Sequence, residues 1–392
     1  MTTPLSYFEA LQDEMTAWRH ALHEHPEIAY EEHWTADFVA ARLAEFGLEP
    51  VRGLGGTGVV ARIGDGSGPR IGLRADMDAL PVHETTNLPY ASKIPGKMHA
   101  CGHDGHMTML LAAARYFAEH PDQLEGTVYV IFQPAEENEA GADAMLRDGL
   151  FEKFPVDAVF GLHNWPGLEE GRFAGRVGPQ MAAFDVFEIL ISGQGAHAAM
   201  PHQGRDMLLV ASHLHGALQS IVSRRVDPVE TAVVSVTQIH GGDSWNVLPS
   251  EVMMRGCTRH FSAAVQDLIE AEMGALCRAA AAGFGVEVRL DYQRRYPATI
   301  NSAAETGMAL AAAASVSGAE GVTDTLPPSM ASEDFAFMLQ QRPGSYIWLG
   351  AGPVRDGGVL HSPTYRFNDA ILARGAAWWV EVARAAQRAH AA

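Results

Sequence analysis

The sequence predicts an α/β fold: a layered domain with a central mixed sheet, interrupted by an inserted ferredoxin-like α+β domain. Strand-like runs alternate with helical segments in the first half of the chain, and this alternation returns after Pro297. Between them the order changes to strand, helix, strand, strand, helix, strand. A chain of 392 residues, 47% of them hydrophobic, is long enough for two domains.

The N-terminal segment predicts two amphipathic helices. The first is indicated by apolar residues at helical spacing, namely Leu5, Phe8, Leu11, Met15, Trp18 and Leu22. The second covers about residues 34–46 and ends before Gly47. Strand-like runs then occupy residues 58–63, 70–75, 127–132 and 156–162, with an alanine-rich helix at about 107–120.

The inserted domain is predicted over residues 183–295, and the outer domain over 1–182 and 296–392. The six elements of the insert are expected at residues 184–191, 205–220, 231–239, 252–260, 263–282 and 286–292. After it, a strand is expected at 346–349 and a closing helix from Asn368.

The composition excludes several classes of protein. A net charge of −19 argues against a non-specific nucleic-acid surface. The cysteines Cys101, Cys257 and Cys277 form no C-x-x-C pair, which fits a reducing compartment and no disulfide framework. The N-terminus lacks the pattern of a secretory signal, and no apolar run is long enough to span a membrane, so we expect a cytoplasmic protein without membrane contact.

Polar residues gather where the predicted strands end. The segments 74–78, 132–137 and 161–165 each follow a strand, and 101–104 opens a helix. Ligands of open α/β sheets bind outside the carboxyl ends of the strands, so these segments are expected to converge in one crevice. Thiolate, imidazole and carboxylate donors together favour a divalent ion such as Zn²⁺ or Mn²⁺.

Each of these residues also has an ordinary structural interpretation. Cys101 could be a small buried residue, and His163 could cap a buried strand. Glu136 and Glu137 could belong to a solvated acidic loop, although neighbours on an extended chain point in different directions, so one could bind metal while the other faces a substrate. His361 could be an ordinary loop histidine.

Eight motifs in order carry a family resemblance that runs essentially end to end. They are LHEHPE at 22–27, LRADMDALP at 73–81, MHACGHDGH at 98–106, FQPAEE at 132–137, GQGAHAAMPH at 193–202, NVLPSE at 246–251, SEDF at 332–335 and LHSP at 360–363. By them the chain resembles the aminoacylase and carboxypeptidase family of two-metal hydrolases, specifically its hippurate hydrolase and auxin-conjugate hydrolase branch.

The resemblance implies a site with two divalent ions, Zn²⁺ or Mn²⁺. Cys101 would bridge the ions, His103 and His163 would complete one site, and Glu137 and His361 the other. Glu136 would be the general base. In the wider family the bridging residue is Asp and another ligand is the His of a His-x-Asp motif, whereas here Asp76 and Asp78 occupy that motif. We therefore infer that His103 replaces the missing imidazole and that both aspartates orient ligands.

The resemblance also implies that the outer domain is catalytic and that the insert is a lid and dimerisation domain. His197 would stabilise the oxyanion, and Asn246 and Arg259 would bind substrate, in some cases across a homodimer or higher homo-oligomer. Arg255 competes with Arg259 for this role, and His197 could instead be an exposed turn residue.

The function expected on this basis is metal-dependent hydrolysis of the amide bond of small-molecule N-acyl or N-aroyl amino acids, releasing a carboxylic acid and a free amino acid. A dipeptidase or carboxypeptidase using the same two-metal site is the alternative, because both reactions cleave an amide next to a free carboxylate. A non-catalytic binding protein that keeps the fold is a third interpretation, of a different class.

Overall fold

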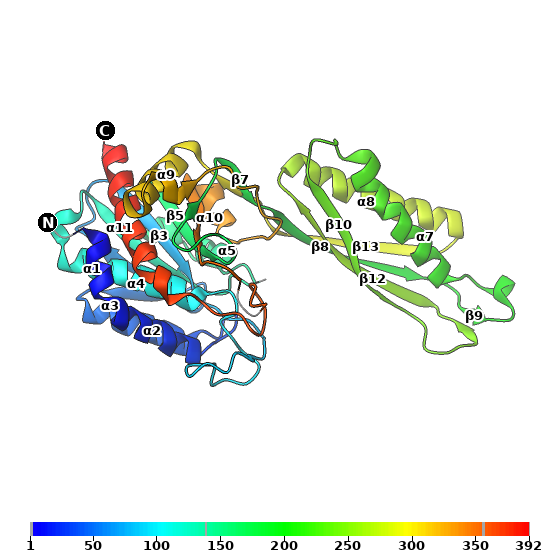
Figure 1. Cartoon of the computed structure of the whole chain (residues 1–392). Helices are drawn as coiled ribbons and strands as arrows, with labels where there is room; N and C mark the ends of the chain where they lie inside the picture. The colour runs from blue at the N-terminus through cyan, green and yellow to red at the C-terminus, as the bar shows by residue number, and fades with distance from the viewer. Residues whose placement is uncertain (1–2, 138, 355–356, 392) are drawn as a thin grey trace. The chain divides into compact units, whose positions relative to one another are not determined.

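The computed structural model describes residues 3–137, 139–354 and 357–391. The chain forms two compact units, Met1–Gln180 with Ile300–Pro327 and Asp334–Ala392, and Met181–Thr299 with Pro328–Glu333 (Figure 1). The sequence pattern assigned residues 328–333 to the outer domain. In the structure this segment joins the second unit, because the backbone N–H of Ala182 donates to the carbonyl oxygens of Ser329 and Ala331.

Over the described residues, the first unit contains an eight-stranded sheet in the order β1-β2-β4-β3-β5-β16-β6-β15. Its strands are β1 Pro50–Leu54, β2 Gly58–Ile63, β3 Arg70–Asp76, β4 Thr127–Gln133, β5 Ala158–Trp165, β6 Phe173–Ala174, β15 Val322–Thr323 and β16 Gly344–Gly350. The central strands β4, β3, β5 and β16 are parallel, and β2 joins β4 antiparallel. The predicted mixed sheet is therefore confirmed.

Helices cover this sheet. They are α1 Pro4–Ala10, α2 Gln12–Glu24, α3 His33–Glu45, α4 His103–Glu119, α5 Gly141–Arg147, α6 Leu150–Lys153, α9 Ala303–Ser317, α10 Ala336–Gln341 and α11 Leu372–Ala391. Helices α4 and α11 pack on each other and on β3, and they are largely buried. None of the described helices combines the length and apolar character needed to cross a membrane.

Two helix boundaries differ from the predicted ones. The first predicted helix is broken at Leu11 into α1 and α2, although Phe8, Met15 and Leu22 are all buried as their spacing predicts. Helix α4 begins at His103, four residues before the predicted start, because Gly102 at φ 94° turns the chain sharply into the helix.

The second unit has a four-stranded antiparallel sheet, over the described residues, in the order β10-β12-β8-β13. Its elements run β8 Ala183–Ser192, α7 Met207–Ser220, β10 Ala232–His240, β12 Glu251–His260, α8 Ala263–Phe284 and β13 Glu287–Tyr296. This order and sheet arrangement confirm the predicted ferredoxin-like topology. Alternate residues of β8 are buried, as expected for a sheet with helices on one face.

Shorter elements complete the chain. The two-residue strands β9 Ala196–His197 and β11 Val247–Leu248 pair with each other, and β7 Gly178–Met181 pairs with β14 Thr299–Asn301. Short 3₁₀ turns cover Pro121–Gln123, Pro201–Gln203, Ala319–Gly321 and Asp369–Ile371, and Ile221–Arg225 forms a π-helical turn.

Candidate metal centre

The candidate metal ligands lie where the parallel strands end. Glu137 follows β4, His163 lies near the end of β5, and His361 comes after β16. Because β3, β4, β5 and β16 are parallel, their carboxyl ends share one edge of the sheet. Cys101 and His103 reach the same edge from the start of α4. The convergence expected from the sequence is thus present within the first unit.

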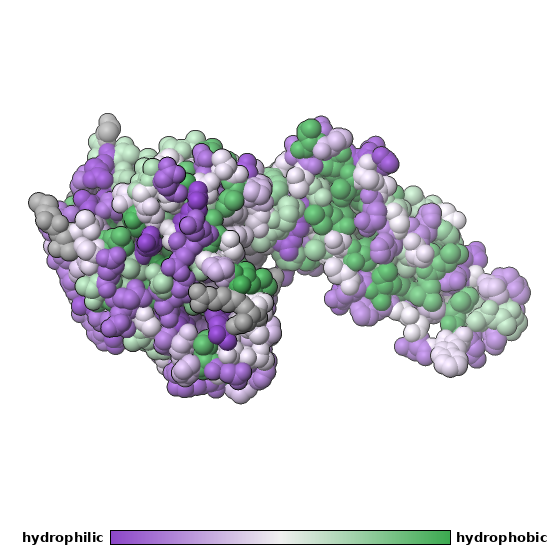
Figure 2. Space-filling model, viewed as in Figure 1, coloured by the Kyte–Doolittle hydropathy of each residue, from purple (hydrophilic) through white to green (hydrophobic). Residues whose placement is uncertain are grey.

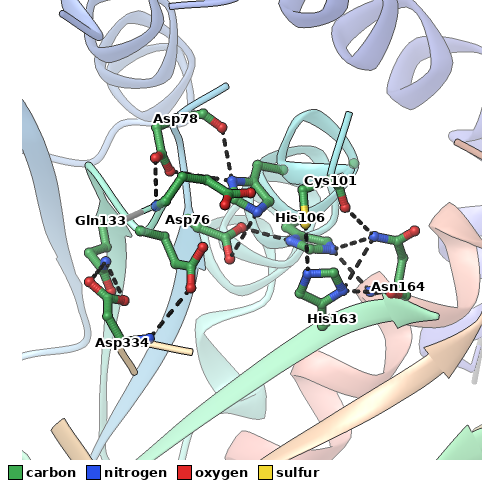
Figure 3. A network of polar contacts seen from close by, with 12 residues as sticks. Asp76, Asp78, Cys101, His106, Gln133, His163, Asn164 and Asp334 are labelled. Carbon is green, nitrogen blue, oxygen red and sulfur yellow. Dashed lines mark hydrogen bonds and ion pairs between the residues drawn. The ribbon is translucent and has the colours of Figure 1, made fainter. Parts of the chain in front are cut away.

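Cys101, His103 and His163 form one group of donor atoms. Their ligand atoms all lie within 4.8 Å of one another, and the three side chains are buried. The Sγ of Cys101 lies 3.4 Å from Nε2 of His163 (Figure 3). A sulfur and a nitrogen bound to the same tetrahedral ion, at about 2.3 and 2.0 Å, would stand about 3.5 Å apart, so the donor spacing fits a shared ion.

Both histidines present Nε2 to this group because Nδ1 is used elsewhere. His103 donates from Nδ1 to the carbonyl oxygen of Asp78 at 2.8 Å, and His163 donates from Nδ1 to the carbonyl oxygen of Asn164 at 2.5 Å. The Nε2 of His103 is buried and has no hydrogen-bond partner among the described residues. A hydrogen bond at the second nitrogen is how proteins fix the tautomer of a metal-binding histidine.

A second group joins Cys101 to Glu137 and His361, again with donor atoms within 4.8 Å of one another. Nε2 of His361 is 3.2 Å from Oε1 of Glu137. His361 has a left-handed backbone with φ 66°, and its N–H donates to the carbonyl oxygen of Ala100, which fixes the loop beside Cys101. Cys101 belongs to both groups, so its Sγ lies where the two groups of donor atoms meet.

Glu136 lies beside these groups. Its side chain is buried, and one of its oxygens lies within 4.8 Å of donor atoms of His103 and Glu137. The backbone N–H of Asp334 donates to Oε1 of Glu136 at 3.4 Å. A carboxylate held next to a metal site, but directed by another contact, is suited to proton transfer.

Asp76 and Asp78 lie beside the buried histidines His103 and His106 and contact their ring nitrogens. Oδ1 of Asp76 accepts a hydrogen bond from Nδ1 of His106 at 2.7 Å, and Oδ2 lies 3.8 Å from Nε2 of His103. Oδ2 of Asp78 accepts the backbone N–H of Glu137 at 2.9 Å. Asp78 thus contacts the segments that carry two candidate ligands.

A buried polar network continues from Asp76 in both directions (Figure 3). Arg74 donates to Asp76 at 2.9 Å and to Asp334 at 3.0 Å. Nε2 of His106 accepts the backbone N–H of Asn164, whose side-chain amide donates to the carbonyl oxygen of Cys101 at 2.7 Å. No role for Asn164 or Asp334 is predicted from the sequence, although Asn164 directly follows the candidate ligand His163.

The surroundings of His163 and His103 shift the pKa values of the two imidazoles in opposite directions. Burial, reinforced by His106, holds the pKa of His163 well below its usual value, so this imidazole is neutral and able to bind a metal. Burial also lowers the pKa of His103, but Asp76 and Asp78 outweigh it and raise this pKa to about 10. Carboxylates that favour a proton on His103 also favour a metal cation beside it, and cation binding would displace that proton.

The candidate residues of the second unit fall into two places. His197 on β9 pairs with Val247, and the N–H of Ala198 donates to the carbonyl oxygen of Asn246, so His197 and Asn246 are neighbours. Arg259 lies near one end of the sheet, paired with Phe184, whereas β9 follows the opposite end of β8. The structure brings His197 and Asn246 together but does not bring Arg259 to them.

The two competing arginines differ in their contacts. Arg255 donates to the carboxylate of Glu188 at 2.7 Å. Arg259 donates to the hydroxyl of Ser332 at 3.0 Å and stacks over the ring of Phe184, and no carboxylate of the described residues lies within ion-pair distance of it. Arg259 is therefore better placed than Arg255 to bind an incoming carboxylate.

Comparisons with known proteins agree on one family. The model of peptidase family M20/M25/M40 matches residues 72–385. A hippurate hydrolase of Campylobacter jejuni is 40% identical over 374 residues, which are 95% of this chain and 96% of that protein. An N-acetyl-L-cysteine deacetylase of Bacillus subtilis is 40% identical over 375 residues, 95% of this chain and 88% of that protein.

A solved structure shows the same relationship. It is a dinuclear metal binding peptidase of the M20 family from Bacillus subtilis, with a TM-score of 0.83 and 33% identity. The alignment covers 96% of this chain and 98% of that one.

Proposed function

The chain belongs to peptidase family M20/M25/M40. We propose that the site formed by the donor groups around Cys101 catalyses the hydrolysis of N-acyl or N-aroyl amino acids. It is a metal-dependent amidohydrolase that cleaves such an amide into a carboxylic acid and a free amino acid. Hippurate and N-acetyl-L-cysteine, named in the relatives, are both N-acyl amino acids. The observation that carries the proposal is the buried thiol of Cys101 shared by two donor groups, with Glu136 beside them.

We assign the ligands of two divalent ions to these groups. His103 and His163 would hold one ion, Glu137 and His361 the other, and Cys101 both. Nε2 of His103 and Oε1 of Glu137 are buried atoms that make no hydrogen bond among the described residues, although each lies within ion-pair distance of another candidate or supporting side chain. This supports the assignment, because a bound cation would satisfy both atoms. Zn²⁺ and Mn²⁺ are the ions that this mixed donor set favours.

The reaction needs a nucleophile, a polarised carbonyl and a proton for the leaving amine. Two bound ions would lower the pKa of a water molecule and polarise the scissile carbonyl. Glu136 would take the proton of the water and pass it to the leaving nitrogen, because an amine leaves poorly as an anion. The N–H of Asp334 keeps Oε1 of Glu136 directed while it does so.

We propose a homodimer because His197 and Arg259 are too far apart to contact one substrate. The paired residues of β8 run from Phe184, opposite Arg259, to Ser192, at the end that leads to His197. Eight residues of strand span about 26 Å, far more than an N-acyl amino acid. One of the two residues would therefore serve the active site of a second copy, with His197 stabilising the oxyanion and Asn246 and Arg259 binding substrate.

Exposed apolar side chains support contact with a second copy. Large hydrophobic residues are exposed around α7 and the β9–β11 pair of the second unit: Met200, Leu208, Leu209, Ile239, Trp245 and Val247. Figure 2 shows hydrophobic surface over α7. Apolar surface of this kind is typical of protein interfaces. Cys101, Cys257 and Cys277, all among the described residues, form no disulfide bond, which supports the cytoplasmic location that we propose.

The experiment that tests the function combines metal analysis with a substrate panel. Protein reconstituted separately with Zn²⁺ and Mn²⁺ should hold two ions per chain and release amino acid from benzoyl- and acetyl-amino acids. Faster cleavage of dipeptides than of acyl-amino acids would favour the peptidase alternative. No bound metal and no turnover on either class would favour a non-catalytic binding protein.

A further inference from the structure

The loop that carries Glu136 and Glu137 is held by carboxylates from three other parts of the first unit. Glu32 accepts the backbone N–H of Ala135 at 2.8 Å and Asp78 accepts that of Glu137 at 2.9 Å. Asp334 accepts the N–H of Ala142 at 2.9 Å, in helix α5 directly after the loop. Charge-assisted hydrogen bonds to backbone N–H groups are among the stronger ones in proteins. The position of the loop therefore depends on these acids.

The loop needs such support because its backbone is strained. Ala135, directly before Glu136, has φ 53°, a left-handed conformation that costs an ordinary residue about 1 kcal/mol. The loop closes where the N–H of Gly141 donates to the carbonyl oxygen of Ala135 at 2.9 Å. A Cβ on Gly141 would lie 1.7 Å from the carbonyl oxygen of Pro134, so the turn is tightly packed. The hydrogen bond from the N–H of Ala135 to Glu32 is thus one of the contacts that hold this conformation.

Glu32 supplies that acceptor at an energetic cost. It is fully buried and stands at the N-cap position of α3, yet its side chain makes no capping bond to that helix. Its two oxygens accept instead from Ala135 and from the hydroxyl of Thr57 at 2.7 Å. Burial and the nearby charge of Asp78 raise its pKa to about 7. A buried acid beside another acid destabilises the fold unless its contacts compensate.

We propose that Glu32 is a positioning residue for the hydrolysis: its hydrogen bond to Ala135 holds the loop so that Glu136 meets the reacting water and amine. Glu32 itself touches neither substrate nor ion in this role. The inference rests on the proposed function, since it concerns how the assigned base is held. Misplacing a catalytic group by about 1 Å can cost about 100-fold in rate.

Two variants separate the hydrogen bond from the charge. Glu32→Gln keeps an oxygen for the N–H of Ala135 and an amide that can donate to Thr57, but it removes the charge. Glu32→Asp keeps the charge but withdraws the carboxylate by one methylene. We expect kcat at saturating metal to fall about 10- to 100-fold in Glu32→Asp, and to stay within about threefold of wild type in Glu32→Gln. KM should change little in either variant.

Glu27→Asp is the matched control. Glu27 accepts the backbone N–H groups of Trp34 and Thr35 and so supports the same helix α3, but among the described residues its carboxylate makes no hydrogen bond to the loop of Glu136. Its shortening should lower thermal stability without the fall in kcat. Equal kcat losses in Glu32→Asp and Glu27→Asp would reduce Glu32 to a structural residue and overturn the inference.

The remaining outcomes distinguish this inference from the proposed function. A Glu32→Asp variant with wild-type kcat, or a Glu32→Gln variant as slow as Glu32→Asp, would overturn the positioning role while hydrolysis by the wild type stands. Wild-type protein without activity on N-acyl amino acids would instead remove the proposed function. Full turnover in Glu136→Gln, measured alongside, would leave hydrolysis standing but remove Glu136 as the base, and with it the positioning role of Glu32.

Discussion

At the scale of single residues, the candidate centre depends on which nitrogen each histidine leaves available. His103, His106 and His163 are all buried within one cluster. His106 uses both ring nitrogens, one on Asp76 and the other on Asn164, whereas His103 keeps Nε2 unpartnered among the described residues. His103 and His106 both belong to the motif at 98–106 and lie three residues apart on one helix. Only their hydrogen-bond partners distinguish the candidate ligand His103 from the supporting residue His106.

Replacing Glu136 tests the assigned base at this scale. Glu136→Gln keeps the size of the side chain but removes its proton affinity, so kcat should fall by at least about 100-fold. Metal content, measured by mass spectrometry of the purified protein, should stay at the wild-type value. Loss of metal together with activity would show instead that Glu136 acts as a ligand.

His23 gives a pH-dependent contribution to stability. Burial lowers its pKa, but hydrogen bonds to Asp104 and Glu84 outweigh burial and raise it to about 9. Since the folded-state pKa lies above the unfolded value of about 6.5, this contribution is fully present below pH 6.5 and is lost as the pH rises through 9. It amounts to a change on the order of 3 kcal/mol.

The measurement is urea unfolding of metal-free wild type and His23→Gln at pH 6, 7.5 and 9.5. The stability difference between the two proteins should shrink steadily across this series, because other titrating groups cancel in the difference. A difference that stays constant with pH would contradict a protonated His23 in the folded state.

At the scale of elements, the turn into α4 sets the spacing of Cys101 and His103. Gly102 has φ 94°, and a Cβ there would lie 2.4 Å from Nδ2 of Asn164 and 2.7 Å from the hydroxyl of Tyr365. The sharp turn allows two residues that are two positions apart to direct their donor atoms to one point, which a regular helix would not do.

Gly102→Ala should therefore damage the metal site. We expect a loss of roughly 2 kcal/mol or more in stability and weaker metal binding, because both the backbone conformation and the space exclude a methyl group. Gly96→Ala is the control: Gly96 also has positive φ, 80°, but a Cβ there would meet no atom of the described residues within 4 Å. Equal metal affinities in the two variants, measured by calorimetry, would contradict the role of Gly102.

At the scale of the whole molecule, the separation of His197 from Arg259 predicts shared active sites. His197→Ala and Arg259→Ala should each be inactive as pure proteins. When they are unfolded and refolded together, half of the dimers are mixed and one site of each mixed dimer is intact, so about one quarter of wild-type activity should return. A mixture that forms mixed dimers yet stays inactive would place both residues in the same subunit's site.

The sequence by itself determined the α/β architecture with its inserted domain, and it predicted the residues of the candidate centre. Hydrophobic periodicity decides which segments become strands and helices, and parallel strands bring their carboxyl ends to one edge, so the placement of Glu137 and His163 at the same edge follows from local pattern and general topology. The candidate base Glu136 and the candidate ligand Glu137 are neighbours in the sequence, but the sequence does not decide the directions of their side chains.

Only the tertiary structure decided the contacts that cross between elements. Glu32 lies 103 positions from Ala135 in the chain, and no local spacing relates them. Nε2 of His103 is directed to the candidate centre because Nδ1 bonds to the carbonyl oxygen of Asp78, which lies in another segment. The distance between His197 and Arg259 likewise depends on strand pairing. Periodicity reports which residues are buried, but hydrogen bonds between distant segments are chosen only when the whole chain packs, because every buried polar group must then find a partner.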